Sequence, residues 1–270
     1  MVDFAREERL VCMRNLAVAT SSQPVRRSSW GRTWPPRVIS DHAADGRGTL
    51  RALREAVASG ADAVALDVMR CGSGDLVIFH EHTLAKFGGR HWEDVSRTPL
   101  PALRELDLGG GERVPLLVDG LAAVPPTVLV DLRLRPAPSD DDRQRTELAT
   151  TAAAIAAKTR GAENVMFGAA DGQALASFPA NVPTALLVHG LPKWVVRPPT
   201  HPPRAVELEL PHCDRAAVRQ WHSRGIAVHL GPATTKSQLV LAWSLHVDGV
   251  ITTDPAAARQ TIDQLLRVAP

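Results

Sequence analysis

Residues 49–68 read TLRALREAVASGADAVALDV and contain both kinds of element from which the fold is built. The first part has the apolar spacing of an amphipathic helix over residues 48–59, and Ser59-Gly60 is a typical helix end. The second part, residues 62–68, alternates small and bulky apolar residues before reaching Asp67, which is typical of a strand. A helix followed at once by a buried strand indicates an α/β protein whose helices connect parallel strands.

The same alternation continues from Arg37 to the C-terminus. Apolar runs that predict strands lie at residues 37–41, 62–68, 126–133, 163–168, 184–188, 204–210, 226–230 and 247–251. Helical patterns lie between them at residues 48–59, 115–123, 141–160, 171–177, 214–224, 235–245 and 255–267. This strand count in a chain of 270 residues predicts a (β/α)8 TIM barrel. A doubly wound open sheet is the alternative, but no GxGxxG motif opens the first helix.

The beginning of the chain differs from the rest in composition. Residues 1–37 hold seven arginines, no lysine and three acidic residues, together with several serines and prolines. We therefore expect residues 1–36 to form a flexible basic arm and residues 37–270 to form the barrel domain. Contact between the arm and an anionic membrane surface is an alternative.

The composition of the whole chain excludes several classes of protein. A formal net charge of +2 is too small for a protein that coats nucleic acid. No apolar run is long enough for a transmembrane helix. Three widely spaced cysteines without a CxxC pair favour neither a disulfide framework nor a thiolate zinc site, so we expect a reducing, cytoplasmic location. No signal peptide is predicted, the codon bias looks bacterial, and the oligomeric state is not predicted.

Alternation along the strands predicts which side chains enter the barrel. If the bulky residues of 62–68 face the helices, then Ala63, Ala65 and Asp67 point inward. The same rule turns Asp131 and Arg133 inward from residues 127–133. It also turns Glu207 and Glu209 inward from residues 204–210. Charged groups near the carboxyl ends of barrel strands lie where active sites of this fold form.

Several segments carry a family resemblance. They read TLRALREAVASGADAVALDV, GSGDLVIFHEHTLAKFGG, VSRTPLPALRELDLGGGERVPLLVDGL and VLVDLRLR between Thr49 and Arg133, with HVDGVITTDPAAA near the C-terminus. In order and spacing they resemble the glycerophosphodiester phosphodiesterase family of the phospholipase C-like superfamily. The resemblance covers roughly residues 38–260 and implies a TIM barrel that hydrolyses phosphodiesters.

This sequence departs from the family at the motif ends. The Glu-x-Asp of the family is Ala65-Leu66-Asp67, its His-Asp is His80-Glu81, and its Glu-x-Lys is Asp131-Leu132-Arg133. The family's first His-Arg-Gly has its nearest match in His42, one position displaced, and the Glu of Glu-Asn-Thr has become Arg47. Two of the family's carboxylates are therefore missing.

The resemblance implies the cleavage of a glycerophosphodiester, or a related small phosphodiester, to an alcohol and glycerol phosphate in lipid metabolism. It implies His80 and His42 as general acid and base, because histidine titrates near neutral pH. It also implies a divalent ion, Mg²⁺ or Ca²⁺, on Asp67 and Asp131, because such hard cations prefer oxygen ligands. Arg133 would bind the phosphate oxygens with its planar fork.

The altered motifs leave alternatives open. The protein is either a phosphoric diester hydrolase or a weakly active or inactive barrel that binds a phosphorylated or lipid head-group ligand. Ion pairs of Asp67 or Asp131 with Arg133 or Arg47 are the alternative to a metal site. We expect Glu209 to act either as a replacement metal ligand or as a partner of Arg133, unless it faces solvent. His229 is a weaker candidate for a substrate contact.

Overall fold

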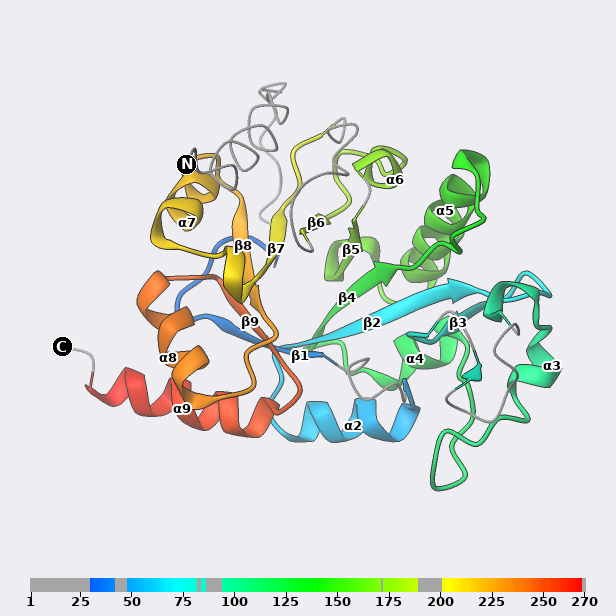
Figure 1. Cartoon of the computed structure of the whole chain (residues 1–270), viewed down its shortest axis with the longest axis horizontal. Coiled ribbons are helices and arrows are strands. Elements are labelled where there is room, and N and C mark those ends of the chain that lie inside the picture. Colours follow the sequence, from blue (N-terminus) through cyan, green and yellow to red (C-terminus); the bar gives the residue numbers. More distant parts are fainter. Residues whose placement is uncertain are drawn as a thin grey trace, which may run out of the picture.

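Eight parallel strands close into a barrel with helices around it, which confirms the predicted fold (Figure 1). The computed structural model describes residues 30–41, 48–81, 84–85, 94–170, 172–188 and 201–268. The barrel strands are β1 (Arg37–Asp41), β2 (Ala63–Arg70), β4 (Leu129–Leu134), β5 (Val165–Ala169), β6 (Thr184–Val188), β7 (Ala205–Glu209), β8 (Ala227–Gly231) and β9 (Gly249–Thr252). The sheet closes because β1 pairs in parallel with both β2 and β9.

The described helices match the predicted ranges to within a few residues at each end, except α3, which no predicted range includes. They are α2 (Leu50–Ala58), α3 (Leu100–Leu103), α4 (Leu117–Ala123), α5 (Asp142–Thr159), α6 (Gly172–Ala176), α7 (Arg215–His222), α8 (Lys236–Leu245) and α9 (Pro255–Val268), with 3-10 turns η2 (Val95–Arg97), η3 (Ala162–Asn164) and η4 (Leu210–His212). Helices α2, α5, α7 and α8 each begin after a residue whose side chain accepts a backbone N–H. These helix starts are therefore determined locally. No helix among the described residues is long and apolar enough to cross a bilayer.

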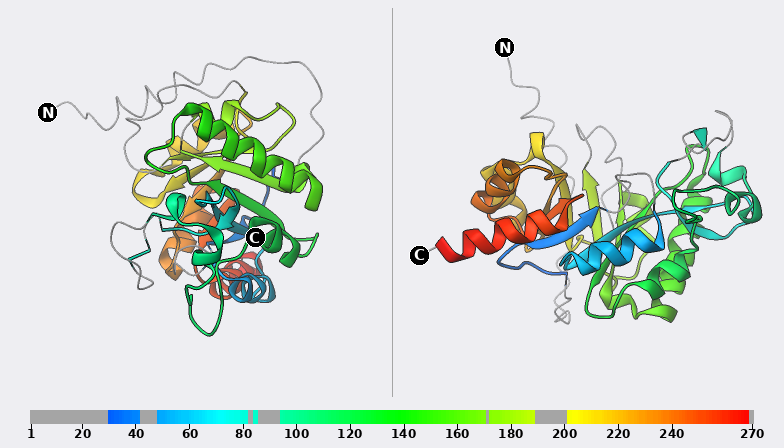
Figure 2. Two further views of the ribbon diagram at one scale, coloured as in Figure 1. Left: turned by 90° about the vertical axis from the view of Figure 1, so that its right-hand side faces the viewer. Right: turned by 90° about the horizontal axis from the view of Figure 1, so that it is seen from below.

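A short strand outside the barrel is the main feature that the predicted ranges lack. β3 (Leu76–Ile78) pairs antiparallel with the end of β2, placing Ile78 opposite Val68. The residues around β3, η2 and α3 form a small apolar cluster of their own, which includes Phe79 and Leu103. This part lies on the right-hand side of Figure 1 and extends away from the barrel in Figure 2. Because β3 follows β2 directly, the residue after Phe79 returns to the carboxyl end of β2.

The start of β4 also differs from the prediction. The strand begins at Leu129, although the apolar pattern predicts its start at residue 126. Two prolines, Pro125 and Pro126, precede it, and the N–H of Val128 donates to the carbonyl of Pro125 in a turn. A turn with this hydrogen bond holds residues 125–128 out of the sheet.

The two faces of the strands carry different side chains, as alternation predicts. Val64 and Leu66 point outward and join the main apolar core between strands and helices. The inner face near the amino ends of the strands is lined by alanines, namely Ala63, Ala65, Ala185, Ala205 and Ala227. Barrel interiors are usually filled by bulky branched residues. Here the small side chains leave room for a larger group.

Trp30 fills that room. Its side chain is completely buried among these alanines, and its ring centroid lies 5.9 Å from that of His229. The residues that follow Trp30 bind the same end of the barrel: the Thr33 N–H donates to Asp248 Oδ1 over 2.9 Å. The last part of the predicted arm therefore packs into the barrel, and residues 1–29 lie outside the described residues.

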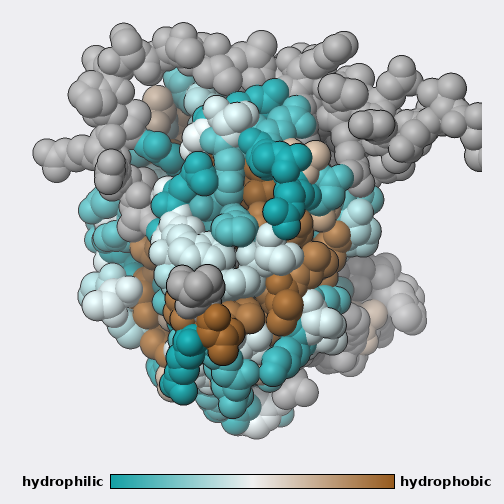
Figure 3. All heavy atoms as spheres, turned by 90° about the vertical axis from the view of Figure 1, so that its left-hand side faces the viewer, coloured by the Kyte–Doolittle hydropathy of each residue, from teal (hydrophilic) through white to brown (hydrophobic). Residues whose placement is uncertain are grey.

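Trp34 packs on the outside of the barrel instead. Its ring lies 4.3 Å from that of Trp243 and 4.9 Å from that of His246, yet the residue remains 45% exposed. This contact belongs to the side of the molecule that carries α7, α8 and α9, where apolar side chains reach the surface (Figure 3). Val240 and Leu241 of α8 are exposed large apolar residues. Trp34 thus covers surface, whereas Trp30 fills the interior.

We predict that Trp30→Ala lowers the free energy of unfolding by about 3–5 kcal/mol, because truncation leaves a cavity in the barrel. Trp34→Ala is the matched control, since it removes a half-exposed ring from the same segment, and it should cost about 1 kcal/mol or less. Urea denaturation measures both. Equal losses in the two variants would contradict the role given to Trp30.

Candidate active site

The site begins with Asp67 and His80 at the carboxyl end of β2. The backbone N–H of Phe79 donates to the Asp67 carbonyl over 3.0 Å, which places the next residue, His80, beside the Asp67 side chain. His80 Nδ1 then donates to Asp67 Oδ2 over 2.5 Å. Asp67 is 2% exposed at its side chain and His80 is 34% exposed. The pair therefore combines a buried carboxylate with an imidazole that solvent or a ligand can reach.

The protonation of His80 follows from this contact. The hydrogen bond to Asp67 raises the pKa of His80 above its ordinary value, and burial opposes the shift without cancelling it. The carboxylate fixes the proton on Nδ1 and stabilises the imidazolium. Nε2 is then the ring nitrogen that can exchange a proton with a bound molecule.

A second group of charges lies inside the barrel around Arg133 of β4. Its Nη2 lies 3.0 Å from Glu207 Oε2, its Nη1 lies 3.4 Å from Asp41 Oδ2, and its Nε lies 3.4 Å from Asp131 Oδ2. The carboxylates come from three different strands, β7, β1 and β4. Asp67 is the register partner of Arg133 on β2, so both groups belong to one site.

Because these groups are buried, the pKa of each one depends on the charges of its neighbours. Desolvation alone would lower the pKa of Arg133, but Glu207, Asp41 and Asp131 together raise it well above its ordinary value. Asp131 is completely buried, and desolvation together with the nearby Glu207 carboxylate raises its pKa well above the usual range for aspartate. The arrangement therefore contains a permanently charged guanidinium beside a buried aspartate whose neutral form is favoured by desolvation and by the Glu207 carboxylate.

His229 of β8 lies deeper in the barrel, next to Glu207 on the neighbouring strand. It is completely buried, and desolvation lowers its pKa to about 4, so it is neutral at neutral pH. Its ring fits because Gly249 faces it: a Cβ on that glycine would lie 2.9 Å from His229 Cδ2. Neither ring nitrogen is hydrogen-bonded by the described residues. We interpret His229 as part of the filling of the interior.

The structure brings together four of the predicted site residues: Asp67, His80, Asp131 and Arg133. Glu209 lies further along β7, at its last position, and is partly exposed. The carboxylate of β7 that reaches Arg133 is instead Glu207. The role of Glu209 as a metal ligand stays a prediction. His42 and Arg47 lie outside the described residues.

The sequence gives Asp41 no role, and it gives Glu207 only a place among the inward charged groups. Asp41 pairs with Arg133, and its inward direction follows from alternation after the buried Ile39. Glu207 was expected to point inward, but nothing in the sequence indicates which of Glu207 and Glu209 reaches Arg133. That choice depends on how far the strands are staggered around the barrel.

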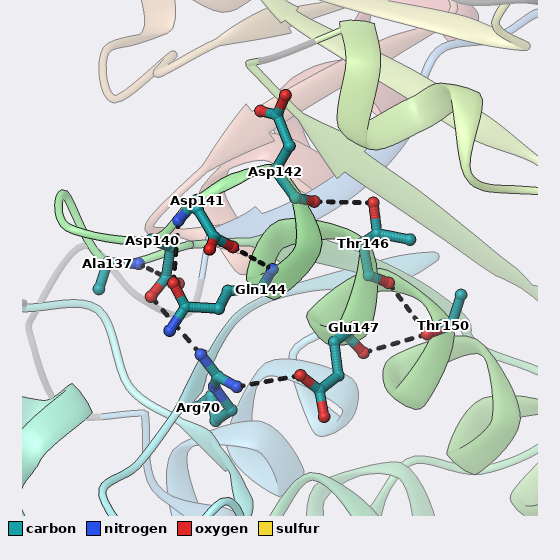
Figure 4. Close-up of polar contacts among 9 residues, drawn as sticks. All are labelled: Arg70, Ala137, Asp140, Asp141, Asp142, Gln144, Thr146, Glu147 and Thr150. Atoms are coloured by element: carbon teal, nitrogen blue, oxygen red, sulfur yellow. Dashed lines mark hydrogen bonds and ion pairs between the residues drawn. The ribbon is translucent and has the colours of Figure 1, made fainter.

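The rim beside this site is fixed by Arg70 at the end of β2 (Figure 4). Its guanidinium lies 3.5 Å from Asp140 Oδ1 and 3.4 Å from Glu147 Oε2, which join it to the β4–α5 loop and to α5. Asp140 also accepts the N–H of Ala137 over 2.9 Å. The loop that leaves the Arg133 strand is thereby held in place.

The buried carboxylates have some of the properties of a divalent-ion site, but not all of them. Asp67 Oδ1 and both oxygens of Asp131 are buried and accept no hydrogen bond from the described residues, so their chemistry suits a hard cation. However, no group of three or more His, Cys, Asp or Glu side chains among the described residues could hold a metal ion. Ala65 supplies no ligand, and the Arg133 guanidinium lies against the carboxylates. The described residues therefore do not fit a resident divalent ion.

The family follows from a sequence comparison. A profile of the glycerophosphoryl diester phosphodiesterase family matches residues 46–257, which is most of the chain. The chain belongs to this family. The matched range includes Asp67, His80, Asp131, Arg133 and Glu207. Glycerophosphoryl diester phosphodiesterases generally use a divalent metal ion. No curated protein matches the chain.

Solved structures of this family share the fold. A candidate glycerophosphoryl diester phosphodiesterase from Silicibacter pomeroyi is 20% identical, with a TM-score of 0.76 over 87% of this chain and 96% of that one. An Oleispira antarctica phosphodiesterase in complex with sn-glycerol-3-phosphate is 21% identical, with a TM-score of 0.73 over 84% and 97%. The Thermotoga maritima glycerophosphodiester phosphodiesterase is 18% identical, with a TM-score of 0.68 over 83% and 97%. At these identities the likeness establishes the fold alone.

We predict that His80 titrates above its ordinary pKa of 6.5 and that Asp67→Asn removes this elevation. Because the folded-state pKa is raised, the pair stabilises the fold fully below pH 6.5. That contribution is lost as the pH rises through the raised pKa. NMR titration of the histidine ring carbons gives the pKa directly. A wild-type His80 that titrates at or below its ordinary value would contradict the assigned hydrogen bond.

Proposed function

We propose that this protein hydrolyses a small phosphodiester of the glycerophosphodiester class to an alcohol and glycerol phosphate, with His80 as its acid–base residue. The observation that carries the proposal is the His80–Asp67 pair, which lies at the barrel mouth in the family's order. Active sites of this fold form at that end of the barrel. Membership of the family supports the substrate class.

The proposed chemistry uses the proton on His80. In hydrolysis, the oxygen of water bonds to phosphorus while the bond to the leaving alcohol breaks. If an adjacent hydroxyl of the substrate attacks first, the alcohol leaves and a cyclic phosphate forms, and water then adds to phosphorus and breaks a ring P–O bond to give glycerol phosphate. The imidazolium gives its Nε2 proton to the leaving oxygen, and Asp67 stabilises the positive ring before that transfer. The attacking group loses its proton to a base, for which His42 is the predicted residue. No step is assigned to a divalent ion, because the described residues do not fit one.

The burial and the ion pairs of Arg133 favour a second candidate function. Its side chain is 11% exposed and is engaged by three carboxylates, and Ala65 replaces a family carboxylate. An arginine held in this way contributes less to binding a phosphate than a free one. The alternative is a barrel that binds a phosphorylated or lipid head-group ligand with little or no turnover.

We predict that His80→Ala lowers kcat by about 10²–10⁴-fold, the usual contribution of a general acid or base. The assay is release of glycerol-3-phosphate from glycerophosphodiesters. His246→Asn is the matched control and should keep the wild-type rate. His246 lies at the opposite end of the barrel, and asparagine tolerates its left-handed backbone, which has φ of 59°.

The same assay separates the two candidates. A His80→Ala protein that keeps the wild-type rate is inconsistent with the acid–base role. If the wild type itself shows no turnover, with and without added Mg²⁺, Mn²⁺ or Ca²⁺, the binding function replaces hydrolysis. Calorimetric titration with sn-glycerol-3-phosphate then tests that function.

A further inference from the structure

The carboxylates inside the barrel lie close to a cationic side chain of the protein, Arg133. Arg133 crosses the interior from β4 to β7, three strands further around the barrel, and reaches Glu207 over 3.0 Å. Its stem passes Gly168 of β5, where an added Cβ would lie 3.5 Å from Arg133 Cγ. The side chain therefore occupies the space into which the carboxylates point.

Each of the inward carboxylates is engaged by a protein group. Asp67 accepts from His80, while Asp41, Asp131 and Glu207 lie within 3.4 Å of Arg133 nitrogens. Glu207 makes the shortest of the Arg133 contacts, from a strand that carries none of the resembling motifs. Its side chain is 4% exposed, so this is a buried pair with little screening by solvent.

We propose that the Arg133 guanidinium, clamped by Glu207, Asp131 and Asp41, is the resident cation of this site and excludes a divalent ion from it. A second cation would lie within a few ångströms of a guanidinium that cannot lose its proton, and would also have to displace it from its carboxylates. Arginine suits the role because its planar fork reaches several acceptors at once, which a lysine ammonium does not. This inference goes beyond the proposed function, and it does not require that the protein hydrolyse anything.

The test measures metal binding, so its failure is distinguishable from a failure of the proposed hydrolysis. The chelator-treated full-length protein is titrated with Mn²⁺, and free Mn²⁺ is followed by its electron paramagnetic resonance signal. The wild type should bind no Mn²⁺ in the barrel at micromolar concentration. Arg133→Met, which removes the guanidinium and keeps an apolar stem, should bind Mn²⁺ at least about tenfold more tightly, as expected for the loss of a nearby like charge. Arg267→Met removes a positive charge from the exposed end of α9 and is the matched control, expected to behave as the wild type.

Two results would overturn the proposal. One is a wild-type protein that binds one Mn²⁺ per chain with micromolar affinity, which would instead support the ligand roles predicted for Asp67, Asp131 and Glu209. The other is a folded Arg133→Met protein, as judged by circular dichroism, that binds no better than the wild type. If this variant does not fold, the Mn²⁺ affinity of Arg133→Lys tests the proposal instead. Its single ammonium cannot hold three carboxylates, so it should also bind Mn²⁺ more tightly than the wild type, and an unchanged affinity counts against the proposal.

Discussion

Charges buried in the barrel must neutralise one another, and the ion pairs of Arg133 meet that requirement. Asp131 and Glu207 are almost completely buried, where an unpaired charge would be very unfavourable. One guanidinium serves both and also reaches Asp41, so it joins β4, β7 and β1 across the interior. The loss of one partner from a buried pair of this kind typically costs about 3–5 kcal/mol. The shape of the site therefore depends on Arg133 more than on any other single side chain.

The barrel interior has two layers with different physical character. Near the amino ends of the strands, alanines surround the buried ring of Trp30, and the contacts are apolar. Toward the carboxyl ends, Asp67, Arg133 and Glu207 replace apolar residues, and the contacts are ionic. Packing in the apolar layer stabilises the barrel. In the ionic layer, Asp67 orients His80 at the mouth of the barrel. The amino ends of the strands thus contribute stability, and their carboxyl ends carry the charged groups of the site.

Much of this arrangement is predictable from the sequence, because it follows from local patterns. Alternation places Ala65, Asp67, Asp131 and Arg133 inside the barrel, and Ser59-Gly60 marks where the first helix ends. Contacts across the barrel are not encoded locally. The choice of Glu207 over Glu209 as the partner of Arg133 depends on the stagger of strands that are not neighbours in the sheet.

Other features escape sequence reasoning for related reasons. The composition of residues 1–37 predicts an arm, but it does not show that Trp30 is the size of the space left by distant alanines. The apolar run before His80 indicates a strand, but it does not show that β3 pairs antiparallel with β2, which is what brings His80 to Asp67. Both features depend on shape complementarity between segments that the sequence does not place together.

A double-mutant cycle on the stability of Arg133→Met, Glu207→Gln and the combined variant tests the central claim most directly. Urea denaturation gives the free energy of unfolding of each protein. If the two side chains neutralise each other inside the barrel, removing both costs less than the sum of the single losses, with a coupling energy of about 1–3 kcal/mol. Losses that add within about 0.5 kcal/mol would show that the residues act independently and would contradict this account.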